Sequence, residues 1–301
     1  MWYYLHSYTY QIIKHNERQY LYMKKIIVLL SILIILTGCS GSKQEAEPKT
    51  DEPATTDVDA LSADDLYHLG LEALKTKEYD KALDYLLKSV EAGGTLAYYD
   101  LGLMYYNGEG VEVDGVKALE YFEKGAESGD GDAMEIAGWC YEKGIGTEVD
   151  VTKALEYYQK GADIGHASCM SRVGWFYDKG IGVEIDEVKA AECYLKAAEA
   201  GDVWSMSTIG YCYLYGAGVE EDDEKAYQWF VKAADNDNAW GCYYLAAMYT
   251  EGLYVDVSAE KAKEYLEKAV SINDEDVINA IKEEIASGYF PAEVVPDSLK
   301  N

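Results

Sequence analysis

The 301-residue sequence is poor in basic residues and histidine, and each shortage excludes a class of function. It has 26 Lys and Arg against 55 Asp and Glu, a formal net charge of −29. A field of that sign repels phosphate backbones and anionic lipid headgroups, so we expect no nucleic-acid partner. Of the four His, only His68 and His166 lie beyond residue 38, and neither has a metal-binding spacing or an adjacent nucleophile. The sequence therefore predicts no enzyme, no cofactor and no metal site.

The sequence also lacks an apolar run long enough for a transmembrane helix, which needs about 20 residues. Its longest run, residues 26–36, has eleven mostly apolar residues and follows Lys24 and Lys25. This pattern is typical of a signal peptide. The run ends in Leu-Thr-Gly and Cys39, which resembles a bacterial lipobox. The resemblance implies that Cys39 is lipidated and becomes the mature N-terminus, outside the cytoplasm.

Three segments precede the folded body. Residues 1–38 are the signal region, and within it residues 1–22 are expected to lie upstream of the true start, Met23. Residues 39–62 contain two Pro, many charges and few large apolar side chains, which predicts a disordered tether. Removal of residues 1–38 leaves 22 basic against 54 acidic residues, a net charge of −32. The lipid alone is then expected to hold the protein at the membrane.

The body of the chain repeats itself with a period of 36 residues. Glycines recur at 102, 138, 174 and 210, with Ala246 at the fifth position. Each is followed by a Tyr three residues later and a Gly six residues later, and then by an Asp (Ser in the fifth copy) and a Lys-Ala pair. The apolar spacing before the second glycine is helical. The glycines of Gly144-Ile145-Gly146 end one helix, and Asp150 is placed to cap the next. Each unit is therefore a helical hairpin that must stack on its neighbours.

The segment LGLMYYNGEGVEVDGVKALEYFEKGAESGD and its copies resemble Sel-one-like (Sel1-like, SLR) repeats, which are relatives of the tetratricopeptide repeat. The resemblance implies an all-α fold, a right-handed α-solenoid of stacked helix-turn-helix repeats. Five such repeats cover residues 95–274, and residues 63–94 resemble a shorter, tetratricopeptide-like unit. Residues 275–301 are expected to form a C-terminal capping helix and tail, with 289–301 loose.

Five cysteines lie in the body, and their state is left open. The pairs Cys140/Cys169 and Cys212/Cys242 are 29 and 30 residues apart and could form disulfides in an exported protein. However, these residues and Cys193 occupy columns that hold Met, Tyr or small residues in other copies, which favours free, buried thiols.

One repeat column predicts a binding surface. The residue after the first glycine is large and aromatic at Trp139, Trp175 and Tyr211. Such rings either form a stripe along one face of the solenoid or pack between adjacent first helices, and the sequence does not decide between the two. Residues one turn away would flank a stripe: Tyr99, Glu142, Asp178 and Tyr215.

An aromatic floor with an acidic rim is suited to a basic protein or peptide. We therefore expect a membrane-anchored scaffold or adaptor for protein–protein interaction through a concave aromatic and acidic surface. Two alternatives are a cell-envelope hydrolase, because relatives are sometimes labelled β-lactamases, and a structural spacer that binds nothing. The oligomeric state does not follow from the sequence.

Overall fold

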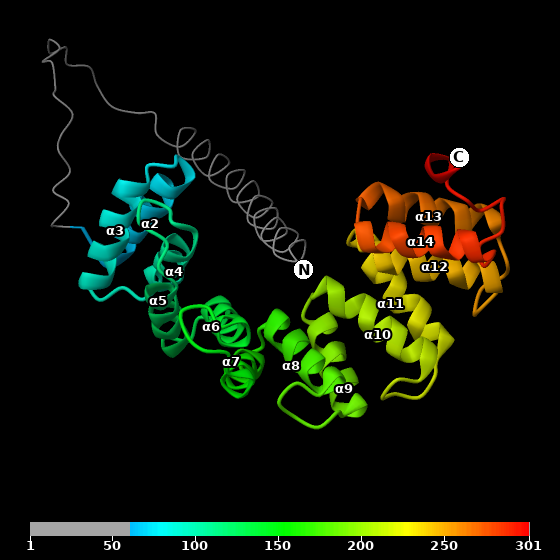
Figure 1. Cartoon of the computed structure of the whole chain (residues 1–301), viewed down its shortest axis with the longest axis horizontal. Helices are drawn as coiled ribbons and strands as arrows, with labels where there is room; N and C mark the ends of the chain where they lie inside the picture. The colour runs from blue at the N-terminus through cyan, green and yellow to red at the C-terminus, as the bar shows by residue number, and fades with distance from the viewer. Residues whose placement is uncertain (1–60, 301) are drawn as a thin grey trace, which may run out of the picture. The chain divides into compact units, whose positions relative to one another are not determined.

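The computed structural model describes residues 61–300, which fold as a series of helical hairpins without β-strands (Figure 1). We call the first helix of each hairpin an A helix and the second a B helix. The A helices are α2 (Ala63–Lys75), α4 (Ala97–Asn107), α6 (Gly131–Lys143), α8 (Ala167–Lys179), α10 (Val203–Tyr215) and α12 (Ala239–Glu251). The B helices are α3 (Tyr79–Glu91), α5 (Gly115–Glu127), α7 (Val151–Asp163), α9 (Glu187–Glu199), α11 (Asp223–Asp235) and α13 (Ala259–Ile272). The chain then forms α14 (Glu275–Ser287) and the 3-10 helix η2 (Asp297–Leu299).

Successive hairpins stack because no hairpin can cover its own apolar face. Every helix from α2 to α14 packs against the next one along the chain. Three A helices also touch the A helix of the following repeat: α4 touches α6, α6 touches α8, and α10 touches α12. The predicted all-α repeat solenoid is therefore confirmed. The expectations for Met23 and Cys39, and those for nearly all of the tether, fall outside the described residues.

The turn between the helices of a hairpin has the predicted structure. In the third hairpin, Gly144 ends α6 in the left-handed region, with φ 72°, and its N–H donates to the carbonyl of Cys140. Gly146 is left-handed as well, and a Cβ there would lie 2.0 Å from the carbonyl oxygen of Gly115 on the preceding B helix. Asp150 caps α7 by accepting the N–H groups of residues 152 and 153 at 3.1 and 3.0 Å. The second glycine is thus needed for conformation and for stacking on the previous repeat.

The glycine that defines the repeat register makes room for a large side chain of the B helix. A Cβ added at Gly138 would lie 2.8 Å from the ring of Tyr158, and one at Gly210 would lie 2.6 Å from the ring of Phe230. The fifth copy has Ala246, and the residue at the position equivalent to Phe230 is the smaller Leu266. The fifth copy thus combines a larger residue at the register position with a smaller one on the B helix.

The last repeat is covered by α14 and by the chain that follows it. Phe290 and Val294 are 2% and 1% exposed and belong to the core cluster of α11, α12 and α13. Lys263 of α13 donates to Asp297 at 3.1 Å. The expectation of a loose tail at 289–301 is therefore wrong for residues up to 300, because two apolar side chains of this segment complete the terminal core.

The five cysteines of the described body are free thiols, and all except Cys193 are buried. Burial raises the pKa of Cys140 to about 12 and the pKa of Cys212 to about 11. Thiols that hold their proton this strongly are poor nucleophiles. These residues accordingly serve as small apolar side chains in the core.

Candidate interaction surface

The two tryptophans of the predicted column are half-buried. Trp139 and Trp175 pack against the core cluster of the middle repeats. The ring of Trp139 on α6 makes an edge contact with Tyr106 on α4, with centroids 5.7 Å apart, and Trp175 contacts Phe176 at the same distance. Trp139 thus packs against the preceding A helix, Trp175 contacts the next residue of its own helix, and both rings keep only part of their surface in solvent.

The tyrosines of the same column are far more exposed. Tyr211 is 42% exposed and Tyr215, one turn later on α10, is 61% exposed. Their ring centroids lie 4.7 Å apart, and Tyr211 also contacts Tyr244 of α12 at 5.9 Å. Two large rings that touch each other and remain in solvent are typical of a binding surface.

Further aromatic rings join this pair, and the repeat pattern did not predict them. On α12, Tyr243 contacts Tyr244 at 5.2 Å and Phe290 at 5.9 Å, and Tyr289 contacts Phe290 at 4.9 Å. The signal was present in the columns two and three residues before the register position, where only the fifth copy has two adjacent aromatic residues and the first copy has Tyr99 followed by Asp100. Helix α12 packs against both α10 and α14, which brings these rings together. We name the C-terminal aromatic patch by its five tyrosines: Tyr211, Tyr215, Tyr243, Tyr244 and Tyr289.

Two carboxylates border the C-terminal aromatic patch. The hydroxyl of Tyr289 donates to Glu251, the last residue of α12. Burial, followed by the charges of Glu284 and Glu251, raises the pKa of Tyr243 to about 12. The same two carboxylates, after burial and Tyr211, raise the pKa of Tyr215. The phenols of Tyr215 and Tyr243 are therefore neutral at ordinary pH and lie beside the negative charge of Glu251 and Glu284.

The remaining predicted residues lie elsewhere. Tyr99 on α4 is half-buried, with its ring 6.1 Å from Phe122. Asp178 on α8 pairs with Lys179 at 2.8 Å. Glu142 was expected at an acidic rim, and instead its side chain is 6% exposed, because it accepts a hydrogen bond from Tyr158 at 3.0 Å and pairs with Lys143. Of the seven predicted residues, the structure brings only Tyr211 and Tyr215 into the patch.

The recurring Tyr and Lys of the repeat form an internal contact. The Lys of each Lys-Ala pair lies over the ring of the Tyr that follows the register glycine, for instance Lys153 over Tyr141 with Nζ 4.6 Å from the centroid. Equivalent contacts occur in all five copies: Lys117 over Tyr105, Lys189 over Tyr177, Lys225 over Tyr213 and Lys261 over Tyr249. Each such cation–π pair joins the second helix of its hairpin to the first. The repeated lysines are thus engaged by the protein's own tyrosines.

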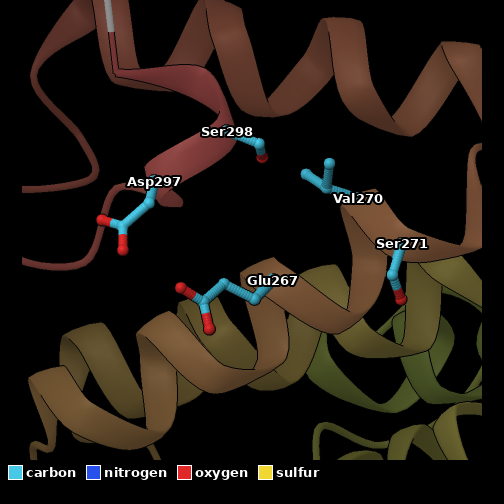
Figure 2. Close-up of a pocket in the computed structure, with 5 residues that line it drawn as sticks. All are labelled: Glu267, Val270, Ser271, Asp297 and Ser298. Carbon is cyan, nitrogen blue, oxygen red and sulfur yellow. The ribbon is translucent and has the colours of Figure 1, made fainter.

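A small cavity of about 390 Å³ lies between α13 and η2 (Figure 2). It is lined by Glu267, Val270, Ser271, Asp297 and Ser298. Lys263 bridges its two carboxylates, at 3.6 Å from Glu267 and 3.1 Å from Asp297. The lining thus offers two carboxylates, two serine hydroxyls and one apolar side chain. No helix of the described residues is long and apolar enough to cross a membrane.

Comparison with known proteins agrees with this architecture. The family model described as Sel1 repeat matches six times, at residues 60–94, 95–130, 131–166, 167–202, 205–238 and 241–274. The first match covers the unit that the spacing assigned to a tetratricopeptide-like form. Residues 23–40 match the model of the prokaryotic membrane lipoprotein lipid attachment site. The protein is therefore an exported lipoprotein, anchored by lipid outside the cytoplasm.

Two solved structures are similar over most of the chain. One is a protective antigen of uropathogenic Escherichia coli strains displaying an SLR fold, with 31% identity, a TM-score of 0.68 and coverage of 77% of this chain. This chain spans 50% of the length of that antigen. The other is a Sel1 repeat protein from Oxalobacter formigenes, with 26% identity, a TM-score of 0.67 and coverage of 73% of this chain and 90% of that one. No curated protein matches the sequence. The six repeat matches, the stacked hairpins and these similar structures establish that the chain belongs to the Sel1 repeat family.

Proposed function

We propose that this lipoprotein is a scaffold that binds a protein or peptide partner at the membrane surface through the C-terminal aromatic patch. The observation that carries the proposal is the exposed ring pair Tyr211 and Tyr215, which adjoins the rings of α12. Exposed, rigid aromatic side chains supply large contact area at low entropic cost, and they dominate the energetics of many interfaces. Sel1 repeats are generally modules of protein–protein interaction, so this role agrees with the family.

The charge of the patch selects its partner. Glu251 and Glu284 border the rings, and the mature chain carries a net charge of −32. Basic side chains would gain both from the carboxylates and from the faces of the tyrosine rings. The partner is therefore a basic protein segment rather than an acidic one. Long-range attraction of this kind acts chiefly on the association rate and weakens with added salt.

Site-directed photo-cross-linking in the native membrane tests the proposal. A photoreactive phenylalanine analogue replaces Tyr215 in the lipidated, full-length protein, and the matched control replaces Tyr254. Tyr254 is also exposed, at 52%, but it contacts Tyr227 and Glu224 of the B helix α11. We expect a discrete cross-linked protein at position 215 that is absent at position 254. Equal products at both positions, or none at 215, would contradict the proposal.

A further inference from the structure

Three potential metal ligands meet where the third and fourth hairpins adjoin. Asp132 and Glu135 lie on α6, and His166 precedes α8. One ligand atom of each lies within 4.8 Å of the others. His166 Nε2 and Asp132 Oδ1 are 3.2 Å apart. The cluster lies on A helices of the middle repeats and is separate from the C-terminal aromatic patch.

The sequence restricts this cluster of three residues to one place in the solenoid. Asp132 and Glu135 are three residues apart on one helix and therefore project from the same face. At the position of His166, the neighbouring A helices have Asp130, Asp202 and Asn238, whose side chains cap their own helices.

His166 makes no such capping bond. Its ring instead lies against Gly131, where an added Cβ would come within 2.6 Å of ring carbon Cδ2. A glycine at this position therefore makes room for the imidazole between the two repeats.

The burial and the charge of the three side chains suit a cation site that is open to solvent on one side. Glu135 is 5% exposed, the side chain of His166 is 22% exposed, and that of Asp132 is 64% exposed. Nδ1 of His166 is buried and has no hydrogen-bond partner in the described residues, so Nε2 is the nitrogen that faces the carboxylates. Arg172 contributes one positive charge nearby, against the three carboxylates of Asp130, Asp132 and Glu135. The negative excess favours a bound cation.

We propose that Asp132, Glu135 and His166 bind a zinc ion that joins these two repeats. Zinc takes imidazole nitrogen and carboxylate oxygen at about 2.0–2.2 Å, commonly with three protein ligands and a water. Ligand atoms in such a tetrahedral site lie about 3.4 Å apart. The 3.2 Å pair already fits, and separations of up to 4.8 Å must close by at most about 1.4 Å. The exposed side of Asp132 leaves the fourth position to water. The ion would hold α6 and α8 in register.

Calorimetric titration of the lipidated, full-length protein with Zn²⁺ tests this site. The test variant is His166→Asn, because Asn238 already occupies the equivalent position and caps its helix. The matched control is His68→Asn, which removes an exposed histidine on α2. We expect one zinc ion per chain in the wild type and in the His68 variant. His166→Asn and Glu135→Gln should each weaken binding by at least tenfold.

Two further measurements distinguish a zinc site from a general attraction of cations to acidic side chains. Thermal unfolding with and without Zn²⁺ should show stabilisation of the wild type and none of the His166→Asn variant. Titration with Ca²⁺ should show binding at least tenfold weaker, because calcium prefers oxygen ligands to imidazole. Absence of zinc binding in the wild type, unchanged binding by His166→Asn, or calcium binding as tight as zinc binding would overturn the proposal.

Discussion

Replacement of Gly210 by Ala tests the packing rule that sets the repeat register. Gly210 lies inside α10, where Ala is ordinarily better than Gly by about 1 kcal/mol. Here a Cβ would lie 2.6 and 2.7 Å from ring carbons Cε1 and Cδ1 of Phe230. Phe230 is fully buried and stacks on Tyr244 with centroids 4.7 Å apart, so the ring has little room to move.

The two contributions to the effect of Gly210→Ala oppose each other. Overpacking of a filled core costs about 1–3 kcal/mol, and the buried, stacked ring places this site at the upper end. After subtraction of the gain in helix propensity, the net loss is about 2 kcal/mol. For a domain of this size that loss lowers Tm by about 4–8 °C.

Equilibrium urea unfolding of two matched pairs measures the effect. One pair compares Gly210→Ala with wild type, and the other makes the same change in a Phe230→Leu background. The double variant recreates the Ala246 and Leu266 combination of the following repeat. We expect Ala to destabilise the first background and to be neutral or stabilising in the second. A stabilising effect in both backgrounds would refute the packing argument.

Three further predictions concern the pH dependence, the terminal core and the anchor. Burial raises the pKa of Asp100 to about 6 from an ordinary 3.8. Between pH 3.8 and pH 6 the carboxyl is therefore protonated in the native state and ionised in the unfolded chain. Stability therefore falls by about 1–2 kcal/mol as pH rises from 4 to 6 and then levels off, and Asp100→Asn should flatten this dependence in unfolding curves at pH 4.5 and 7.5. Phe290→Ala removes a buried ring and should cost about 3–5 kcal/mol in urea unfolding, whereas Glu293→Ala at an exposed position of the same segment should cost little. Cys39→Ser removes the lipid acceptor, so fractionation should move the protein out of the membrane pellet.

The features predicted from the sequence are those that depend on nearby residues and recur in every repeat. Gly144 and Asp150 act within a few residues of their own positions, and five copies in register repeat the same requirement. The C-terminal aromatic patch was only half predicted because it depends on the last two repeats and α14. Tyr243 and Tyr289 join the patch only because α12 packs against α10 and α14. The residues in contact there do not occupy equivalent positions of the 36-residue repeat, so the repeat pattern does not predict these contacts.

Side-chain orientation also escaped prediction in particular cases. Glu142 lies three residues after Trp139 and was expected at an exposed rim, but its carboxylate accepts a hydrogen bond from the hydroxyl of Tyr158 on the following helix. Phe290 follows the end of α14 by three residues, and no periodic signal shows that it returns to the core. In both cases one contact with a neighbouring element decides the outcome.

The C-terminal aromatic patch is proposed to bind a basic protein partner. The most direct measurement is the affinity of the lipidated protein, in detergent, for the partner identified by cross-linking at position 215. It compares the Tyr211→Ala and Tyr215→Ala double variant with the Tyr254→Ala control. Loss of two anchoring rings should weaken binding by about 30-fold, or about 2 kcal/mol, and the control should bind as wild type does. A double variant that stays folded and binds within twofold of wild type would contradict the account.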